Sequence, residues 1–183
     1  MDWWRPALNP EGLSQGDILS GILVGSPNEP KAFLGRDKWS NRGREYWPQV
    51  PELDTYRTDG TGLYVSRGKR CYGLVLSHSC EIDKNKDRGR VLVALVSPIE
   101  QVSDVKVREG ILAQKRRAFM PLPDVPGVGT CYADLRQINF VAQNSLSEND
   151  RMASISDDGL VRLHAQLVAF FTRVDFNTLS KAV

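Results

Sequence analysis

Residues 71–98 read CYGLVLSHSCEIDKNKDRGRVLVALVSP, and this stretch decides the fold class. Two short apolar runs, residues 72–77 and 91–96, flank a polar segment that contains Asp87 and Gly89. Short apolar runs bounded by turn formers are typical of buried β-strands. The stretch therefore predicts two neighbouring antiparallel strands in the core of the protein.

Further strands and one clear helix are predicted on either side of this pair. Residues 18–24 form an apolar run entered through a turn, and residues 132–141 alternate loosely, so both read as strands. Residues 102–117 show a weaker helical pattern. The clearest helix comes last, with Ser156 as its N-cap. Its expected buried face consists of Leu160, Leu163, Leu167, Val168 and Phe171.

This succession of elements predicts a mainly β (α+β) fold, a small barrel with a C-terminal helix packed on it. The chain has 183 residues, enough for one sizeable core, and no repeat or low-complexity segment divides it. We therefore expect a single domain, 1–183.

Composition and cysteine usage restrict where the protein is located and which metals or cofactors it uses. The longest apolar run, residues 91–96, is far shorter than the roughly 20 residues that cross a bilayer, and the N-terminus lacks the layout of a signal peptide. Cys71, Cys80 and Cys131 match neither a zinc motif nor a disulfide framework. We expect a cytoplasmic protein with no metal, no cofactor and no membrane contact.

The net charge of +2 says little about partners, but basic residues gather locally in residues 36–44, 84–90 and 115–117. Such clusters are usually solvated loops, and they attract nucleic acid only when folding places them on one face. The second cluster supplies three candidate substrate-binding side chains, Lys84, Lys86 and Arg88.

Short motifs follow one another in an order that belongs to one family. They are Gly16-Asp17-Ile18, Val75-Leu76-Ser77, Ser97 at the end of the next strand, Asp134 with Arg136, and MASIS at residues 152–156 before the last helix. In this order the chain resembles the MazF/PemK toxins over about half of its length. The resemblance implies an SH3-like barrel built from residues 15–24, 70–98 and 131–173, with residues 31–64 and 102–126 as long insertions.

The same resemblance implies a function. MazF/PemK-like toxins are metal-independent endoribonucleases that act on single-stranded RNA in bacterial or phage toxin–antitoxin systems. Carried over, Arg70 and Ser97 would be catalytic, Arg136 would bind substrate, and an antitoxin-like protein or a second copy of the chain would be a partner. Arg70-Cys71-Tyr72 stands where the family has Arg-Pro, with the arginine one position earlier. A non-catalytic module that binds nucleic acid or protein on the same barrel is the alternative.

The sequence SHSCEID, residues 77–83, has three interpretations. His78 can serve as a catalytic base if the strand ends at residue 78 and at Ser97 meet in one groove. Alternatively, His78 can activate Cys80 as a nucleophile. The third interpretation, which we favour for Cys80, is a strand end that satisfies backbone groups and buries the thiol as a small hydrophobic group.

Two further sets of residues have a structural and a functional interpretation. Asp134 and Arg136 share one strand face, so a structural pair is expected ahead of direct substrate contact. Trp3 and Trp4 can stack on unpaired bases, but tryptophans in such a segment more often clamp a barrel end or a dimer face. Trp39 and Trp47 are open to the same two interpretations.

Overall fold

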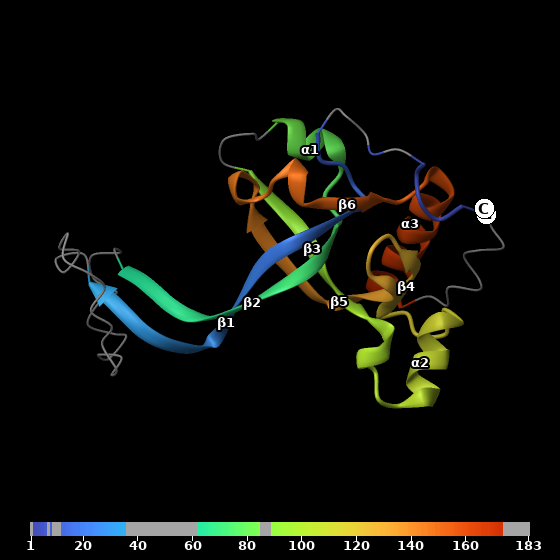
Figure 1. The fold of residues 1–183 in the computed structure, drawn as a ribbon, viewed down its shortest axis with the longest axis horizontal. Coiled ribbons are helices and arrows are strands. Elements are labelled where there is room, and N and C mark those ends of the chain that lie inside the picture. Colours follow the sequence, from blue (N-terminus) through green and yellow to red (C-terminus); the bar gives the residue numbers. More distant parts are fainter. Residues whose placement is uncertain (1, 7, 9–11, 36–61, 85–88, 174–183) are drawn as a thin grey trace. The chain divides into compact units, whose positions relative to one another are not determined.

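The structure is a computed structural model that describes residues 2–6, 8, 12–35, 62–84 and 89–173 (Figure 1). It divides into two compact units, one formed by residues 1–22 and 71–183 and the other by residues 23–70. The sequence predicts one domain, residues 1–183, and both units lie within those bounds. The positions discussed below lie in the first unit unless stated otherwise.

The described part of the chain forms mainly β-structure with a C-terminal helix. The elements are β1 (Asp17–Gly35), β2 (Gly62–Val75), α1 (Ser79–Lys84), β3 (Arg90–Pro98), a 3-10 turn (Ile99–Gln101), α2 (Val105–Leu112), β4 (Phe119–Val125), β5 (Gly129–Ala142), two more 3-10 turns (Gln143–Ser145 and Glu148–Asp150), β6 (Arg151–Ser154) and α3 (Asp157–Thr172).

The strands form one curled antiparallel sheet in the order β4-β5-β3-β2-β1-β6, a half-barrel (Figure 1). The predicted neighbours β2 and β3 pair directly, with Tyr72 opposite Val96 and Val75 opposite Val93. The mainly β fold and the antiparallel pair are thus confirmed. Sequence reasoning missed two strands, β4 in the expected second insertion and β6 in the MASIS link.

The main core lies on one face of this sheet. On β3, Ala94 and Val96 face it, and their neighbours across the sheet include Leu74 on β2 and Ala133 on β5. α3 contributes Leu163, which is fully buried. Because side chains alternate along a strand, Leu95 and Ser97 point to the opposite face.

Asp17, in the Gly-Asp-Ile motif, is a buried structural residue. It is fully buried, and its carboxylate accepts hydrogen bonds from Ser154 Oγ at 2.5 Å and from the backbone N–H of Ser14 at 2.7 Å. Arg151 Nη1 lies 3.3 Å from the same carboxylate. Asp17 therefore joins the start of β1 to β6, and charge pairing makes its burial tolerable.

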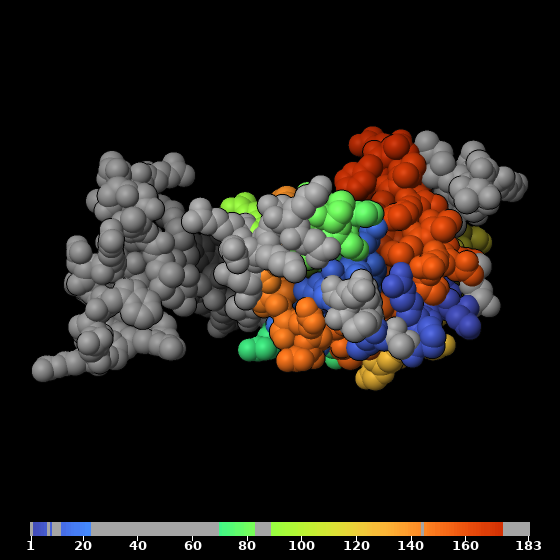
Figure 2. Space-filling view, turned by 90° about the horizontal axis from the view of Figure 1, so that it is seen from above, coloured from blue at the N-terminus to red at the C-terminus, as the bar shows by residue number. Residues whose placement is uncertain are grey.

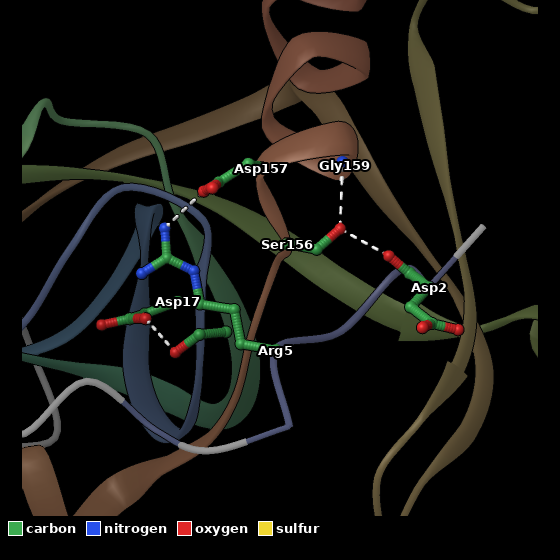
Figure 3. A network of polar contacts seen from close by, with 7 residues as sticks. Asp2, Arg5, Asp17, Ser156, Asp157 and Gly159 are labelled. Carbon is green, nitrogen blue, oxygen red and sulfur yellow. Dashed lines mark hydrogen bonds and ion pairs between the residues drawn. The ribbon is translucent and has the colours of Figure 1, made fainter.

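The predicted N-cap of α3 is confirmed. Ser156 Oγ accepts a hydrogen bond from the Gly159 N–H at 3.2 Å and donates one to the Asp2 carbonyl at 2.5 Å (Figure 3). Arg5 pairs with Asp157 in the first helical turn at 3.0 Å (Figure 3). These contacts hold the N-terminal segment against the start of the helix.

The same segment carries the two described tryptophans. Trp4 Nε1 donates to the Pro123 carbonyl at 2.8 Å, and the Trp3 carbonyl accepts from the Ser156 N–H at 2.9 Å. Both rings pack against the core, so these two tryptophans have a structural role.

The buried face of α3 differs from the expected one. Leu163 is buried, but Val168 is 45% exposed and Phe171 is 68% exposed. Gln166 is fully buried instead, because its side-chain N–H groups donate to the carbonyls of Arg117 at 2.8 Å and Phe119 at 3.2 Å. A polar side chain at a core position thus sets the rotation of the helix, and hydropathy alone does not show this.

Candidate functional site

Side chains of β3, β4 and β5, most of them half-buried, gather on the face of the sheet opposite the core. Ser97 on β3 lies opposite Tyr132 on β5, which in turn lies opposite Pro121 on β4. Asp134 on β5 likewise lies between Leu95 and Phe119. Residues directly opposite in antiparallel strands share a face and touch. We call this set the outer face: Leu95, Ser97, Phe119, Pro121, Tyr132, Asp134 and the adjoining Arg136.

A bulge in β5 brings Arg136 to the outer face. Ala94 pairs with Ile138, but the next residue, Leu95, pairs with Asp134, so residues 135–137 have no partner on β3. Leu135 turns inward and is buried, and its N–H donates to the Ala118 carbonyl at 2.9 Å. A bulge of this kind bends the strand and redirects side chains. Here it leaves the Arg136 side chain 59% exposed.

The carboxylate of Asp134 holds the bulge in place. It accepts from Arg136 Nε at 2.9 Å, Nη2 at 2.8 Å and the backbone N–H at 3.0 Å, and from Gln137 Nε2 at 3.1 Å. Burial alone would raise the pKa of Asp134, but the hydrogen bonds from Arg136 and Gln137 outweigh it and lower the pKa below its ordinary value. The expected structural pair is present, and it fixes one orientation of the guanidinium.

That orientation places the guanidinium over an aromatic ring. Arg136 Cζ lies 4.5 Å from the centre of the Phe119 ring, within the range of a cation–π contact. Tyr132 meets the same ring edge to face, with the ring centres 5.5 Å apart. Three side chains from β4 and β5 therefore form one ordered stack, with the hydroxyl-bearing Ser97 across the strand pair from Tyr132.

The outer face offers two kinds of recognition. The Phe119 ring and the flat guanidinium of Arg136 provide stacking surfaces, and Ser97, Tyr132 and Gln137 provide hydrogen-bond donors and acceptors. The carboxylate of Asp134 is nearly buried and already accepts four hydrogen bonds, so its role is to position Arg136.

His78 lies at the other end of the β2–β3 pair from Ser97. Ser77 Oγ accepts from the Leu92 N–H at 2.8 Å, which places residue 78 near the start of β3. From Leu92 to Ser97 the strand runs about 16 Å at its normal rise per residue. The expectation that His78 and Ser97 share one groove is therefore wrong, because antiparallel pairing sends the two strand ends in opposite directions.

His78 and Cys80 do contact each other. His78 Nδ1 lies 3.1 Å from Cys80 Sγ and 3.3 Å from the Cys80 backbone N. Both residues are exposed, so the prediction that the strand end buries Cys80 is also wrong. The chain leaves the strand and starts α1 at Ser79, which turns the thiol outward; this segment is green at the surface in Figure 2.

The remaining candidates lie in the other unit or outside the described residues. Arg70 is exposed and belongs to the unit of residues 23–70. The Lys84 side chain, Lys86 and Arg88 lie outside the described residues, as do Trp39 and Trp47. Among the candidates that the structure describes in the first unit, Ser97 and Arg136 meet on one face. Sequence reasoning missed their aromatic neighbours, Phe119 and Tyr132.

Within the described residues, no group of three or more His, Cys, Asp or Glu side chains is placed to hold a metal ion. Likewise, none of the described helices is long and apolar enough to span a membrane. No family model and no curated protein sequence matches this chain. The resemblance to the MazF/PemK toxins therefore stays a prediction, and the function is inferred from the geometry of the outer face.

Proposed function

We propose that this protein is a divergent SH3-like barrel of the MazF/PemK kind that binds single-stranded RNA on the outer face. One observation carries the proposal: Asp134 holds the Arg136 guanidinium over the Phe119 ring, beside Tyr132 and Ser97. Unpaired bases stack on aromatic rings and on arginine planes, and neighbouring hydroxyl and amide groups read their edges.

Arg136 is the side chain best placed to stack on a base. Its side chain is 59% exposed, and the contacts to Asp134 prevent it from swinging away. A base that stacks on the guanidinium lies in one column with Arg136 and the Phe119 ring. Because Asp134 neutralises the charge, binding here comes mainly from stacking and hydrogen bonds, and each stacked base contributes about 1–3 kcal/mol.

Replacing the ring beneath Arg136 tests the proposal. Phe119→Leu keeps an apolar side chain but removes the stack, so the dissociation constant for a labelled single-stranded RNA should rise about 5- to 150-fold. Phe140→Leu is the matched control, because Phe140 is an exposed aromatic residue at the far end of β5 from Tyr132. Equal affinities of wild type and Phe119→Leu for RNA pools of varied sequence would contradict the proposal.

Metal-independent cleavage of the bound RNA is the second candidate function. Ser97 favours it, because its hydroxyl lies opposite Tyr132, on the face that carries Arg136, where donors can stabilise a charged phosphorane. Asp134 is a poor base because its pKa is lowered, and His78 lies too far away, so binding ranks first. The homodimer and the antitoxin-like partner stay predictions.

Incubation of RNA with the protein in a chelator separates the two functions. If cleavage occurs, Ser97→Ala should slow it about a hundredfold or more at saturating protein, where a change in RNA affinity does not affect the rate. The same rate in Ser97→Ala would remove Ser97 from the reaction. Intact RNA at saturating protein, with normal binding, would leave the binding function alone.

A further inference from the structure

We infer that the turn between α2 and β4 carries the phosphate backbone of the same RNA strand, through Lys115, Arg116 and Arg117 together with Arg173 at the end of α3. This inference rests on the proposed function and extends it: the outer face takes bases, and the turn takes phosphates. Neither the expected substrate-binding cluster, Lys84, Lys86 and Arg88, nor the expected catalytic residues lie in this turn.

The turn is firmly held. The buried Gln166 of α3 donates to the carbonyls of Arg117 at 2.8 Å and Phe119 at 3.2 Å. The Phe119 N–H donates to the Arg116 carbonyl at 3.0 Å. Lys115 is fixed at the start of the turn by its own N–H, which donates to the Gly110 carbonyl at 2.9 Å. A fixed backbone lowers the entropic cost of presenting these side chains to a ligand.

The turn is continuous with the outer face. The Ala118 carbonyl accepts from the N–H of Leu135, the first residue of the bulge that presents Arg136. Arg117 precedes Phe119 by two residues, so their Cα atoms are at most about 7 Å apart. Arg117 Nη1 also donates to the Arg173 carbonyl at 3.2 Å, which brings the end of α3 to the same place.

Within the described part of the chain, no acidic side chain pairs with the charges of this turn. Lys115, Arg116, Arg117 and Arg173 are all exposed, and no carboxylate of the described residues forms an ion pair with them. Three other arginines do have acidic partners: Arg5 with Asp157, Arg136 with Asp134, and Arg151 with Asp17. A local excess of positive charge beside a stacking surface fits the phosphates of a bound single strand.

Arg117 also has a structural role, because its hydrogen bond to the Arg173 carbonyl stabilises the C-terminal end of α3. The test variant is therefore Lys115→Gln/Arg116→Gln/Arg117→Gln, in which glutamine removes the charge and keeps a hydrogen-bond donor. The matched control, Lys84→Gln/Lys86→Gln/Arg88→Gln, removes the same charge from the expected substrate-binding cluster. Circular dichroism and the melting temperature check that both variants remain folded.

The measurement is the affinity for a single-stranded RNA oligomer across a range of salt concentrations. Each phosphate contact on a single strand contributes about 0.7 to the slope of log K against log salt, so losing three contacts should reduce the slope by about 2. The control variant lacks the charges that the sequence predicts to bind substrate, and its slope should fall less than that of the turn variant. A slope in the turn variant that equals that of the wild type, or that falls no more than in the control, would overturn the inference.

An abasic ribose–phosphate oligomer separates this inference from the proposed function. Wild type and Phe119→Leu should bind it equally, whereas the turn variant should bind it more weakly and with a smaller salt slope. If Phe119→Leu binds normal RNA as well as wild type while the turn variant fails, the stacking proposal fails alone. Two outcomes would overturn the base-stacking proposal and the phosphate-binding inference together. One is wild-type binding to poly-glutamate rather than to either oligomer, which would indicate an acidic protein ligand. The other is no binding to any of these probes.

Discussion

The two ends of the β2–β3 pair carry polar residues of similar type but organise them differently. At the Ser97 end, Asp134 and Arg136 bind each other through several hydrogen bonds and a ring lies beneath the guanidinium. At the other end, His78 and Cys80 form a polar side-chain contact with each other, and both residues are exposed. Organised, preoriented groups support recognition, whereas the exposed pair supports only reactivity of the thiol itself.

The largest expected effect is a difference in alkylation rate between the exposed thiol of Cys80 and the buried thiol of Cys131. Cys80 should react with iodoacetamide in the native protein at least about a hundredfold faster than Cys131, measured by mass spectrometry at neutral pH. Cys131 is fully buried, and burial, aided by nearby Glu100, raises the pKa of its thiol to about 11, which leaves little thiolate.

A Cys71→Ser background keeps the half-buried third thiol out of this measurement. Labelling of Cys80 as slow as that of Cys131 would show that the α1 end is closed in solution. The contrast between the two ends would then be lost.

Removing one carboxylate tests the organised end. Asp134→Ala leaves the Arg136 N–H and the Gln137 amide without their acceptor, so the free energy of unfolding should fall by about 1–3 kcal/mol in urea denaturation. Most of this effect comes from the bulge, because the half-exposed Arg136 charge is well solvated. His78→Ala is the control at the other end and should change stability by less than about 0.5 kcal/mol. Equal losses in the two variants would contradict the comparison.

The lowered pKa of Asp134 predicts a pH dependence of stability. Its folded pKa lies below the ordinary value of about 3.9, so the ionised carboxylate stabilises the fold above that pH, and this contribution disappears as the pH falls through the folded pKa. As the pH falls below about 4, wild type should therefore lose stability more steeply than Asp134→Asn. Parallel stability curves would show that the carboxylate is not preferentially stabilised in the folded state.

The features that were predicted correctly depend on residues that lie close together in the chain. The runs 72–77 and 91–96 pair as expected, and Ser156 caps α3, because each depends on residues close together in the chain. β4 was missed because its sequence, FMPLPDV, contains Pro121 and Pro123, and proline argues against a central strand. β4 lies at the end of the sheet order, where a missing N–H is tolerated.

The candidate site depended on contacts that no short stretch contains. Sequence alternation placed Asp134 and Arg136 on one face, but their meeting with Phe119 requires the bulge at residues 135–137 and the pairing of β4 with β5. Cys80 was misplaced for a local reason: the strand end was expected to bury its thiol, and the chain instead turns into α1, where Cys80 is exposed. Register and strand ends are set by tertiary packing rather than by local pattern.

The smallest expected effect concerns the contact between His78 and Cys80. His78 Nδ1 lies within reach of both the Cys80 thiol and the Cys80 backbone N–H, at 3.1 Å and 3.3 Å. A neutral imidazole nitrogen that accepts has a single lone pair, so the two donors compete for it and the thiol gains only part of the assistance that a dedicated base would give. His78→Ala should therefore slow alkylation of Cys80 by only about two- to tenfold. His78→Asn is the matched variant, because its amide oxygen can still accept the backbone N–H while offering no imidazole to the thiol. A loss of a hundredfold or more in both variants would show that His78 is a dedicated base for Cys80, and the α1 end would then be as organised as the outer face.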